Sequence, residues 1–255
     1  MHLPWCSWGG MFPHLNQPKV VELTASGTAP FYADLVECNN SGAITVDLYP
    51  AALMRGKTLT IKKTSNNTLA VTIDADGSDS IDGAGTVVLY VRYDTITIYS
   101  NGTTWQIVAD GRFKHSCKIN RAASQTGIVT GTVTQIQMDA TLVDTGGLAD
   151  LANYGIAIRR TGTYLIASTI RFQNMGDTSQ VQTRMNNNGS IFALNIAYSP
   201  VASAIVYAKD LTTAPLTAGD LVTFSTYQTS GANRDTDAQS VHGLDATPQL
   251  LVTEL

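Results

Sequence analysis

Tyr164-Leu165-Ile166-Ala167-Ser168-Thr169-Ile170-Arg171-Phe172 is the stretch that decides the fold of this 255-residue chain. Two sets of alternate residues divide it: Tyr164, Ile166, Ser168, Ile170 and Phe172 in one, and Leu165, Ala167, Thr169 and Arg171 in the other. Successive side chains of a β-strand point to opposite faces of its sheet, so this alternation predicts a strand with a buried face.

The same period of two recurs on both sides of this stretch. Upstream, Ile44–Leu48, Thr58–Lys62 and Thr95–Tyr99 alternate, and turn-forming Asn, Asp and Gly residues separate them. The only helical hint upstream is the turn at Ala51–Met54, and a second short helical turn is expected downstream at Leu148–Leu151. From residue 128 onward about eight longer strands are expected, which is the size of a β-sandwich or jelly roll. The chain is therefore predicted to be all-β.

Composition shifts divide the chain into four parts. Residues 1–18 are predicted to be an N-terminal peptide, residues 19–110 a β-sandwich or barrel-like module, residues 111–127 a linker, and residues 128–255 a jelly-roll head. The linker prediction rests on 111–127 carrying four basic residues, no acidic residue and no strand period. A basic linker of this kind could be solvated or lie against acidic neighbours.

Large apolar residues crowd the N-terminal peptide without a strand or helix period. Trp5, Trp8 and Phe12 are the candidates for an anchor that docks into a neighbouring subunit, because exposing such side chains to water is unfavourable. The alternative is a terminus that folds back on its own domain.

The charge pattern excludes several classes of partner. Charged residues make up 14% of the chain and the net charge is −4, so no clustered basic face is expected for nucleic acid. The sequence contains no run of 18 apolar residues, so no membrane span is predicted. Residues 1–6 lack the features of a signal peptide. Three scattered cysteines predict no disulfide framework. The expectation is a product that is made in the cytoplasm and assembled rather than secreted.

Several short pieces follow one another in order along residues 20–110, none of them specific alone: Arg55-Gly56-Lys57, Ile61-Lys62-Lys63, Val71-Thr72-Ile73, Ile81-Asp82-Gly83 and Asn101–Ile107. In this order they resemble a module of phage tail-fibre and virion-appendage proteins. The resemblance implies a structural role in a virion.

Three pieces of residues 128–255 form a second pattern: Arg160–Leu165, Leu216–Val222 and the terminal strand Gln249–Leu255. This pattern resembles the jelly-roll head of tumour-necrosis-factor ligands and complement globular heads, in its phage version. The aromatic Phe-Gly signature of cellular members is missing, which favours the phage analogy.

Both resemblances imply homotrimers. A separate argument comes from strands with apolar residues on both faces, such as Ile191–Tyr198, which have more surface to bury than one core accepts. Tyrosine buries a large ring while keeping a polar tip. The candidates for a contact at the three-fold axis are Tyr164, Tyr198, Tyr207 and Tyr227, whose alternative role is ordinary packing within one copy.

Four carboxylates lie close together in the sequence, at Asp74, Asp76, Asp79 and Asp82. They are candidate calcium ligands, but the spacing of a calcium-binding hand loop is missing, so turn geometry is the favoured explanation and no metal or other cofactor is expected. The pairs His115-x-Cys117 and His2…Cys6…His14 lack the spacing of a zinc site.

No catalytic motif is present in the sequence. Asp220 and Asp245 are the carboxylates to watch, and no nucleophile elbow or phosphate loop accompanies them. The sequence thus predicts a non-enzymatic, trimeric virion appendage that binds a host-surface glycan or protein, or stabilises a capsid; tail fibre, spike and head fibre all remain open. The alternative is a carbohydrate-binding or polysaccharide-degrading domain.

Overall fold

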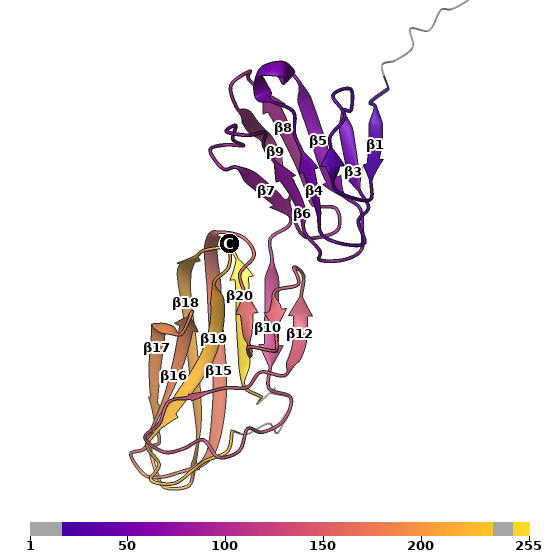
Figure 1. Cartoon of the computed structure of the whole chain (residues 1–255). Helices are drawn as coiled ribbons and strands as arrows, with labels where there is room; N and C mark the ends of the chain where they lie inside the picture. Colours follow the sequence, from indigo (N-terminus) through magenta and orange to yellow (C-terminus); the bar gives the residue numbers. More distant parts are fainter. Residues whose placement is uncertain (1–16, 237–246) are drawn as a thin grey trace, which may run out of the picture. The chain divides into compact units, whose positions relative to one another are not determined.

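The computed structural model describes residues 17–236 and 247–255, and the chain divides after Arg112 into two compact units. Figure 1 shows that both units are built of strands. The strands of the first unit are β1 (Val20–Leu23), β2 (Gly27–Thr28), β3 (Leu35–Cys38), β4 (Ile44–Asp47), β5 (Thr58–Lys63), β6 (Val71–Asp74), β7 (Thr86–Leu89), β8 (Thr95–Ser100) and β9 (Trp105–Asp110). The helical turn expected at residues 51–54 is a 3-10 helix, η1 (Ala51–Met54).

The described strands of the first unit form two sheets, ordered β1-β3-β5-β8-β9 and β2-β4-β6-β7. From β1 to β6 the chain alternates between the sheets, and each strand pairs in parallel with the strand two positions later. Three successive turns of the chain therefore stack as a coil. The last strands run antiparallel to this coil, with β7 pairing with β6 and β8 pairing with β5.

The alternating residues seen in the sequence line the space between these two sheets. Val36, Ile61, Ile73, Ile96 and the other inward residues are fully buried in one core cluster. The large ring of Trp105 closes this core, and its indole N–H donates to the carbonyl of Tyr49. The expectation of a two-sheet, sandwich-like module is met, with a coiled rather than hairpin connection.

A buried lysine lies where two turns of the coil meet. The ammonium of Lys63 has no exposed surface and donates to Asn40 Oδ1 at 3.0 Å, Ser65 Oγ at 2.7 Å and Asn67 Oδ1 at 2.8 Å. An ammonium has three protons, so these three oxygens satisfy it fully. Burial lowers the pKa of Lys63, and the negative charge of nearby Asp94 opposes that shift. The network joins the loop after β3 to the loop after β5.

The second unit begins with a strand that the sequence did not predict. Its strands are β10 (Ser116–Asn120), β11 (Thr134–Gln135), β12 (Ala140–Asp144), β13 (Ala149–Asp150), β14 (Gly155–Ala157), β15 (Gly162–Met175), β16 (Gln180–Asn187), β17 (Ser190–Tyr198), β18 (Ala204–Leu216), β19 (Leu221–Gln228) and β20 (Gln249–Glu254). The prediction that residues 111–127 are a linker without strands is wrong. β10 lies inside a sheet, between β12 and β20, because Cys117 and Ile119 face the core while Lys118 points outward.

Nested pairing defines the architecture of the second unit. β10 pairs with β20, β14 with β19, β15 with β18 and β16 with β17, all antiparallel. These eight strands thus form one long rolled hairpin, in which β10, β14, β15 and β16 pair in turn with β20, β19, β18 and β17. The rolled strands form two sheets, ordered β12-β10-β20-β15-β18 and β13-β14-β19-β16-β17. This is the strand order of a jelly roll, as the sequence predicted.

The two sheets of the jelly roll enclose one apolar core. Tyr164, Ile166 and Phe172 of β15 and Phe224 of β19 contribute its large, fully buried side chains. Gly155 of β14 brings its backbone close to β19: a Cβ atom there would lie 2.7 Å from the Val222 carbonyl oxygen. The close approach explains why glycine starts this short strand.

Candidate self-association and binding surfaces

Large apolar side chains are clustered along one edge of the jelly roll, where they remain exposed in a single folded copy. The β17–β18 edge consists of Ile191, Leu194, Ile196, Tyr198, Val201, Ile205, Tyr207 and Leu211, which are each between 38% and 67% exposed. β17 and β18 end their respective sheets and follow one another in the chain, and the side-chain amide of Asn195 donates to the Lys209 carbonyl between them. Apolar patches of this kind mark interaction sites on soluble proteins.

The outward face of the first sheet carries apolar residues in a single cross-strand row. Strand register aligns Val143, Lys118, Leu251, Ala167 and Leu211 across all five strands. Four of the five are apolar, and Leu211 belongs both to this outer row and to the β17–β18 edge. The edge and the outer row thus form one continuous surface, extending from β12 to β17.

The four tyrosines proposed for a three-fold axis do not lie together. Tyr164 is fully buried in the core of its own unit, and its hydroxyl donates to the Arg160 carbonyl at 2.6 Å, so its proposed axis role is wrong. Tyr207 lies on the outward face of the first sheet, next to Arg171. Tyr198 and Tyr227 lie on the outward face of the second sheet, where each pairs with a neighbour on β16.

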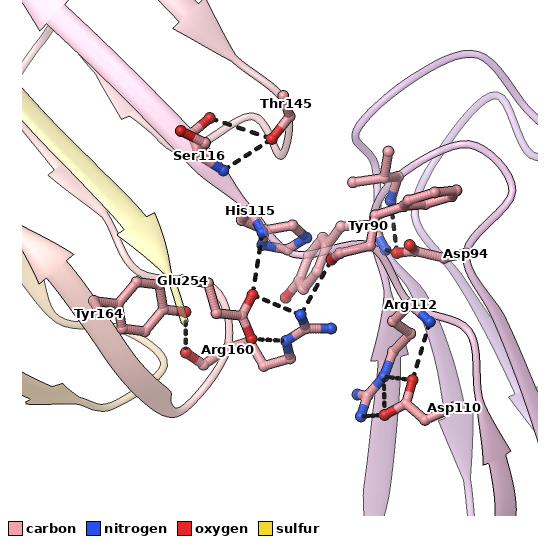
Figure 2. Close-up of polar contacts among 12 residues, drawn as sticks. Tyr90, Asp94, Asp110, Arg112, His115, Ser116, Thr145, Arg160, Tyr164 and Glu254 are labelled. Carbon is pink, nitrogen blue, oxygen red and sulfur yellow. Dashed lines mark hydrogen bonds and ion pairs between the residues drawn. The ribbon is translucent and has the colours of Figure 1, made fainter.

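A largely buried ion pair holds the terminal strand of the jelly roll (Figure 2). The Arg160 guanidinium donates to both carboxylate oxygens of Glu254, at 2.8 and 2.6 Å, and the backbone N–H of His115 donates to the same carboxylate at 3.2 Å. The two side chains are 18% and 10% exposed. Burial alone would raise the pKa of Glu254, but the hydrogen bonds from Arg160 and His115 and the charge of Arg160 hold it below its ordinary value.

This cluster is suited to structure rather than to acid–base chemistry. Burial, reinforced by the charge of Glu254, raises the pKa of Tyr164 to about 12, so its hydroxyl stays protonated and donates to the backbone carbonyl of Arg160. The Glu254 carboxylate is ionised and already fully engaged. The pair therefore ties β20 to the segment that precedes β15.

The four candidate calcium ligands are not gathered into a site. Among the described residues no group of three or more His, Cys, Asp or Glu side chains is placed to hold a metal ion. Asp79 instead accepts the Ala51 N–H at 2.7 Å, and Asp82 accepts the Ile107 N–H at 3.2 Å. Asp79 and Asp82 therefore satisfy backbone donors of other segments of the first unit.

The other residues singled out from the sequence fall into two groups. Cys117 is buried in the core, and burial, with the charge of Asp144, raises the pKa of its thiol to about 12, which disfavours metal ligation. Asp220 accepts hydrogen bonds from Asn187, Asn188 and the Thr217 N–H in a turn.

Outside the described residues lie the anchor candidates Trp5, Trp8 and Phe12, the zinc candidates His2, Cys6 and His14, and Asp245.

Two polar cavities lie on the described surface, one in each unit. In the second unit, a cavity of about 360 Å³ is lined by amide, hydroxyl and charged groups from Ser124, Gln173, Asn174 and the segment 233–236. In the first unit, a cavity of about 370 Å³ is lined by Gln17, Lys19, Phe31, Tyr32, Asp34 and Lys57. The residues that line the cavity of the first unit were not predicted from the sequence, although the two aromatic residues directly after Pro30 were a visible signal.

No helix within the described ranges has the length and apolar character needed to span a membrane.

No protein-family model and no curated protein sequence matches the chain. Solved structures are similar to it at low identity, each over 56% of this chain. They include murine APRIL (14% identity, 100% of that chain, TM-score 0.42), the globular domain of the zebrafish complement 1qA protein (10%, 97%, 0.41) and the Eiger TNF of S. frugiperda (13%, 94%, 0.43). Because these TM-scores lie below 0.5, the jelly roll is established by the nested strand pairing of the second unit.

Proposed function

We propose that the chain is a non-catalytic structural module that works as a homotrimer and binds other molecules through its surfaces. The observation that carries this proposal is the surface formed by the β17–β18 edge and the outer row. Every side chain of the β17–β18 edge is at least 38% exposed in a single copy, and four of the five residues of the outer row are apolar. A second copy offers the simplest way to remove them from water.

A three-fold arrangement suits this surface better than a two-fold one. In a cyclic trimer each contact joins two different patches, whereas a two-fold contact joins a patch to itself. The β17–β18 edge protrudes at the end of both sheets, while the outer row spans the flat face of one. The edge of one copy packing on the outer row of the next would bury both patches in all three copies.

We propose further that this trimer is a phage-type virion appendage, a tail fibre, spike or head fibre. Support comes from the pieces of residues 20–110 that resemble the appendage module, and from the low charge of the chain. In this proposal residues 1–18 attach the protein to the particle, and the two folded units are presented for host-surface binding or capsid stabilisation.

Deleting residues 1–18 separates attachment from assembly. The deletion variant is expected to form the same trimer as the full chain, because both proposed patches lie in the second unit, and to be missing from purified particles. A double variant, Trp5→Ala and Trp8→Ala, should show the same loss with less change to the chain. Particles that incorporate the deletion variant at the normal level would contradict the anchor, and a variant that loses the trimer would contradict the placement of the patches.

A further inference from the structure

A turn in the first unit presents two aromatic side chains to solvent. The Ala33 N–H donates to the Pro30 carbonyl at 2.9 Å, which makes Phe31 and Tyr32 the two central residues of a β-turn. Ala29 and Ala33 flank them and are buried in the core. Phe31 is nevertheless 66% exposed and Tyr32 46% exposed, with their rings edge to face at 5.5 Å. Central turn positions favour small polar residues or proline, so two aromatic residues there need a reason.

Polar groups complete a cavity next to these rings. Lys57 Nζ lies 2.8 Å from Asp34 Oδ1, and the backbone N–H of Lys19 donates to Asp34 Oδ2 at 3.0 Å. The Lys19 ammonium lies 5.8 Å from the centre of the Tyr32 ring. With the Gln17 side chain, these groups line a cavity of about 370 Å³. A cavity of this size accommodates a small ligand.

The ion pair supplies an acceptor beside a donor at the cavity wall. The hydrogen bond from Lys57, followed by that from the Lys19 backbone, lowers the pKa of Asp34, so its carboxylate is ionised at neutral pH. Lys57 carries ammonium protons at the same place. An acceptor and a donor 2.8 Å apart match a pair of hydroxyl groups on adjacent carbons, since each hydroxyl both donates and accepts.

We propose that this cavity binds a neutral pyranose unit of a surface polysaccharide. The C–H face of such a ring is apolar and packs on an aromatic ring, while its hydroxyls bond to Asp34, Lys57 and Gln17. The Asp34–Lys57 ion pair has no net charge, which suits an uncharged ligand, and the Lys19 ammonium gives the whole lining a charge of +1. The inference rests on the proposed function only for the source of the sugar, a surface polysaccharide. The residues of the site all belong to one copy, so binding does not require the trimer.

Saturation-transfer NMR on the full chain tests the site with the methyl glycosides of glucose, galactose, mannose and N-acetylglucosamine. At least one is expected to receive saturation at its ring protons, with a dissociation constant of about 1 mM, as expected for a single small ligand held by few contacts. The double variant Phe31→Ala and Tyr32→Ala should weaken this binding by about tenfold or more. Asp34→Asn should weaken it while leaving the rings in place.

Tyr93→Ala is the matched control. Tyr93 is 47% exposed in the same unit and lies near the cationic groups of Lys62 and Arg92, but it does not line the cavity. Its replacement should leave saccharide binding unchanged. Absence of transfer to all four glycosides, or transfer that survives loss of both rings, would overturn the inference. A trimer that fails one of these binding tests would refute the saccharide site and leave the proposed function unaffected. A monomer that binds sugar would refute the proposed trimer and support the saccharide site.

Discussion

Replacing Leu211 by aspartate tests the proposed contact at the point where the β17–β18 edge meets the outer row. Leu211 is 67% exposed in a single copy. Fully burying a leucine contributes about 1.5–3 kcal/mol, so the exposed two-thirds would contribute about 1–2 kcal/mol per copy on assembly. Over three equivalent contacts this amounts to roughly 3–6 kcal/mol, and the buried carboxylates add a desolvation cost. Since 1.4 kcal/mol changes an equilibrium constant tenfold, Leu211→Asp should weaken trimer formation by at least about 100-fold.

Light scattering coupled to size exclusion, over a dilution series from micromolar concentrations, measures this effect. The variant should dissociate at concentrations where the wild-type chain remains assembled. Its denaturant midpoint as a monomer should change little, because an exposed substitution alters folding by about 0.5 kcal/mol or less. Leu53→Asp is the control, because Leu53 is 76% exposed on η1 of the first unit, whereas both patches consist of residues of the second unit. If Leu211→Asp and Leu53→Asp assemble equally well, the β17–β18 edge is not the contact.

Three further predictions concern stability. Glu254→Gln should destabilise the second unit by roughly 1.5–3 kcal/mol. The pKa of Glu254 in the folded protein lies below its ordinary value of 4.5, so the stabilisation from its pair with Arg160 is complete above about pH 4.5 and is lost as the pH falls. The stabilities of wild type and variant should therefore converge in acid unfolding curves. Lys63→Met should destabilise the first unit by about 2–4 kcal/mol, because Asn40, Ser65 and Asn67 each lose the hydrogen bond from the ammonium that joins them, and an unchanged urea midpoint would refute the network. Gly155→Ala should cost about 1–3 kcal/mol through the clash with the Val222 carbonyl, and a neutral result in thermal unfolding would show that β14 can shift.

Strand positions could be predicted because alternation reports directly which residues face a core. The set Tyr164, Ile166, Ile170 and Phe172 is buried, and the nested jelly-roll pairing follows the expected strands. The same alternation already placed Tyr164 with the core residues. Its proposed role at a three-fold axis was wrong because that role would need the opposite face of β15.

Pairing direction could not be predicted, because a strand with one buried face has the same pattern in parallel and antiparallel sheets. The parallel coil of β1–β6 was therefore not visible in the sequence. β10 was missed for a different reason. Cys117 and Ile119 carry the strand signal, but the surrounding basic residues suggested a solvated linker, whereas Lys118 simply points outward from the sheet.

The binding surfaces were only partly visible in the sequence. The apolar excess of Ile191–Tyr198 correctly identified a strand with too much to bury, since four of its large side chains are exposed. The cavity beside Phe31 and Tyr32 depends on Lys57, which lies in the chain after β4 and η1 and reaches Asp34 only through the coil. Contacts of this kind depend on tertiary structure and leave no local pattern.

The molar mass of the purified full chain in solution decides whether the chain is a trimer. One copy has a mass of 27.2 kDa, and we expect a species of roughly 82 kDa, three times that value, which persists at micromolar concentration. A stable species of 27.2 kDa at the same concentration would mean that the β17–β18 edge and the outer row remain exposed in solution, and it would contradict the proposed trimer.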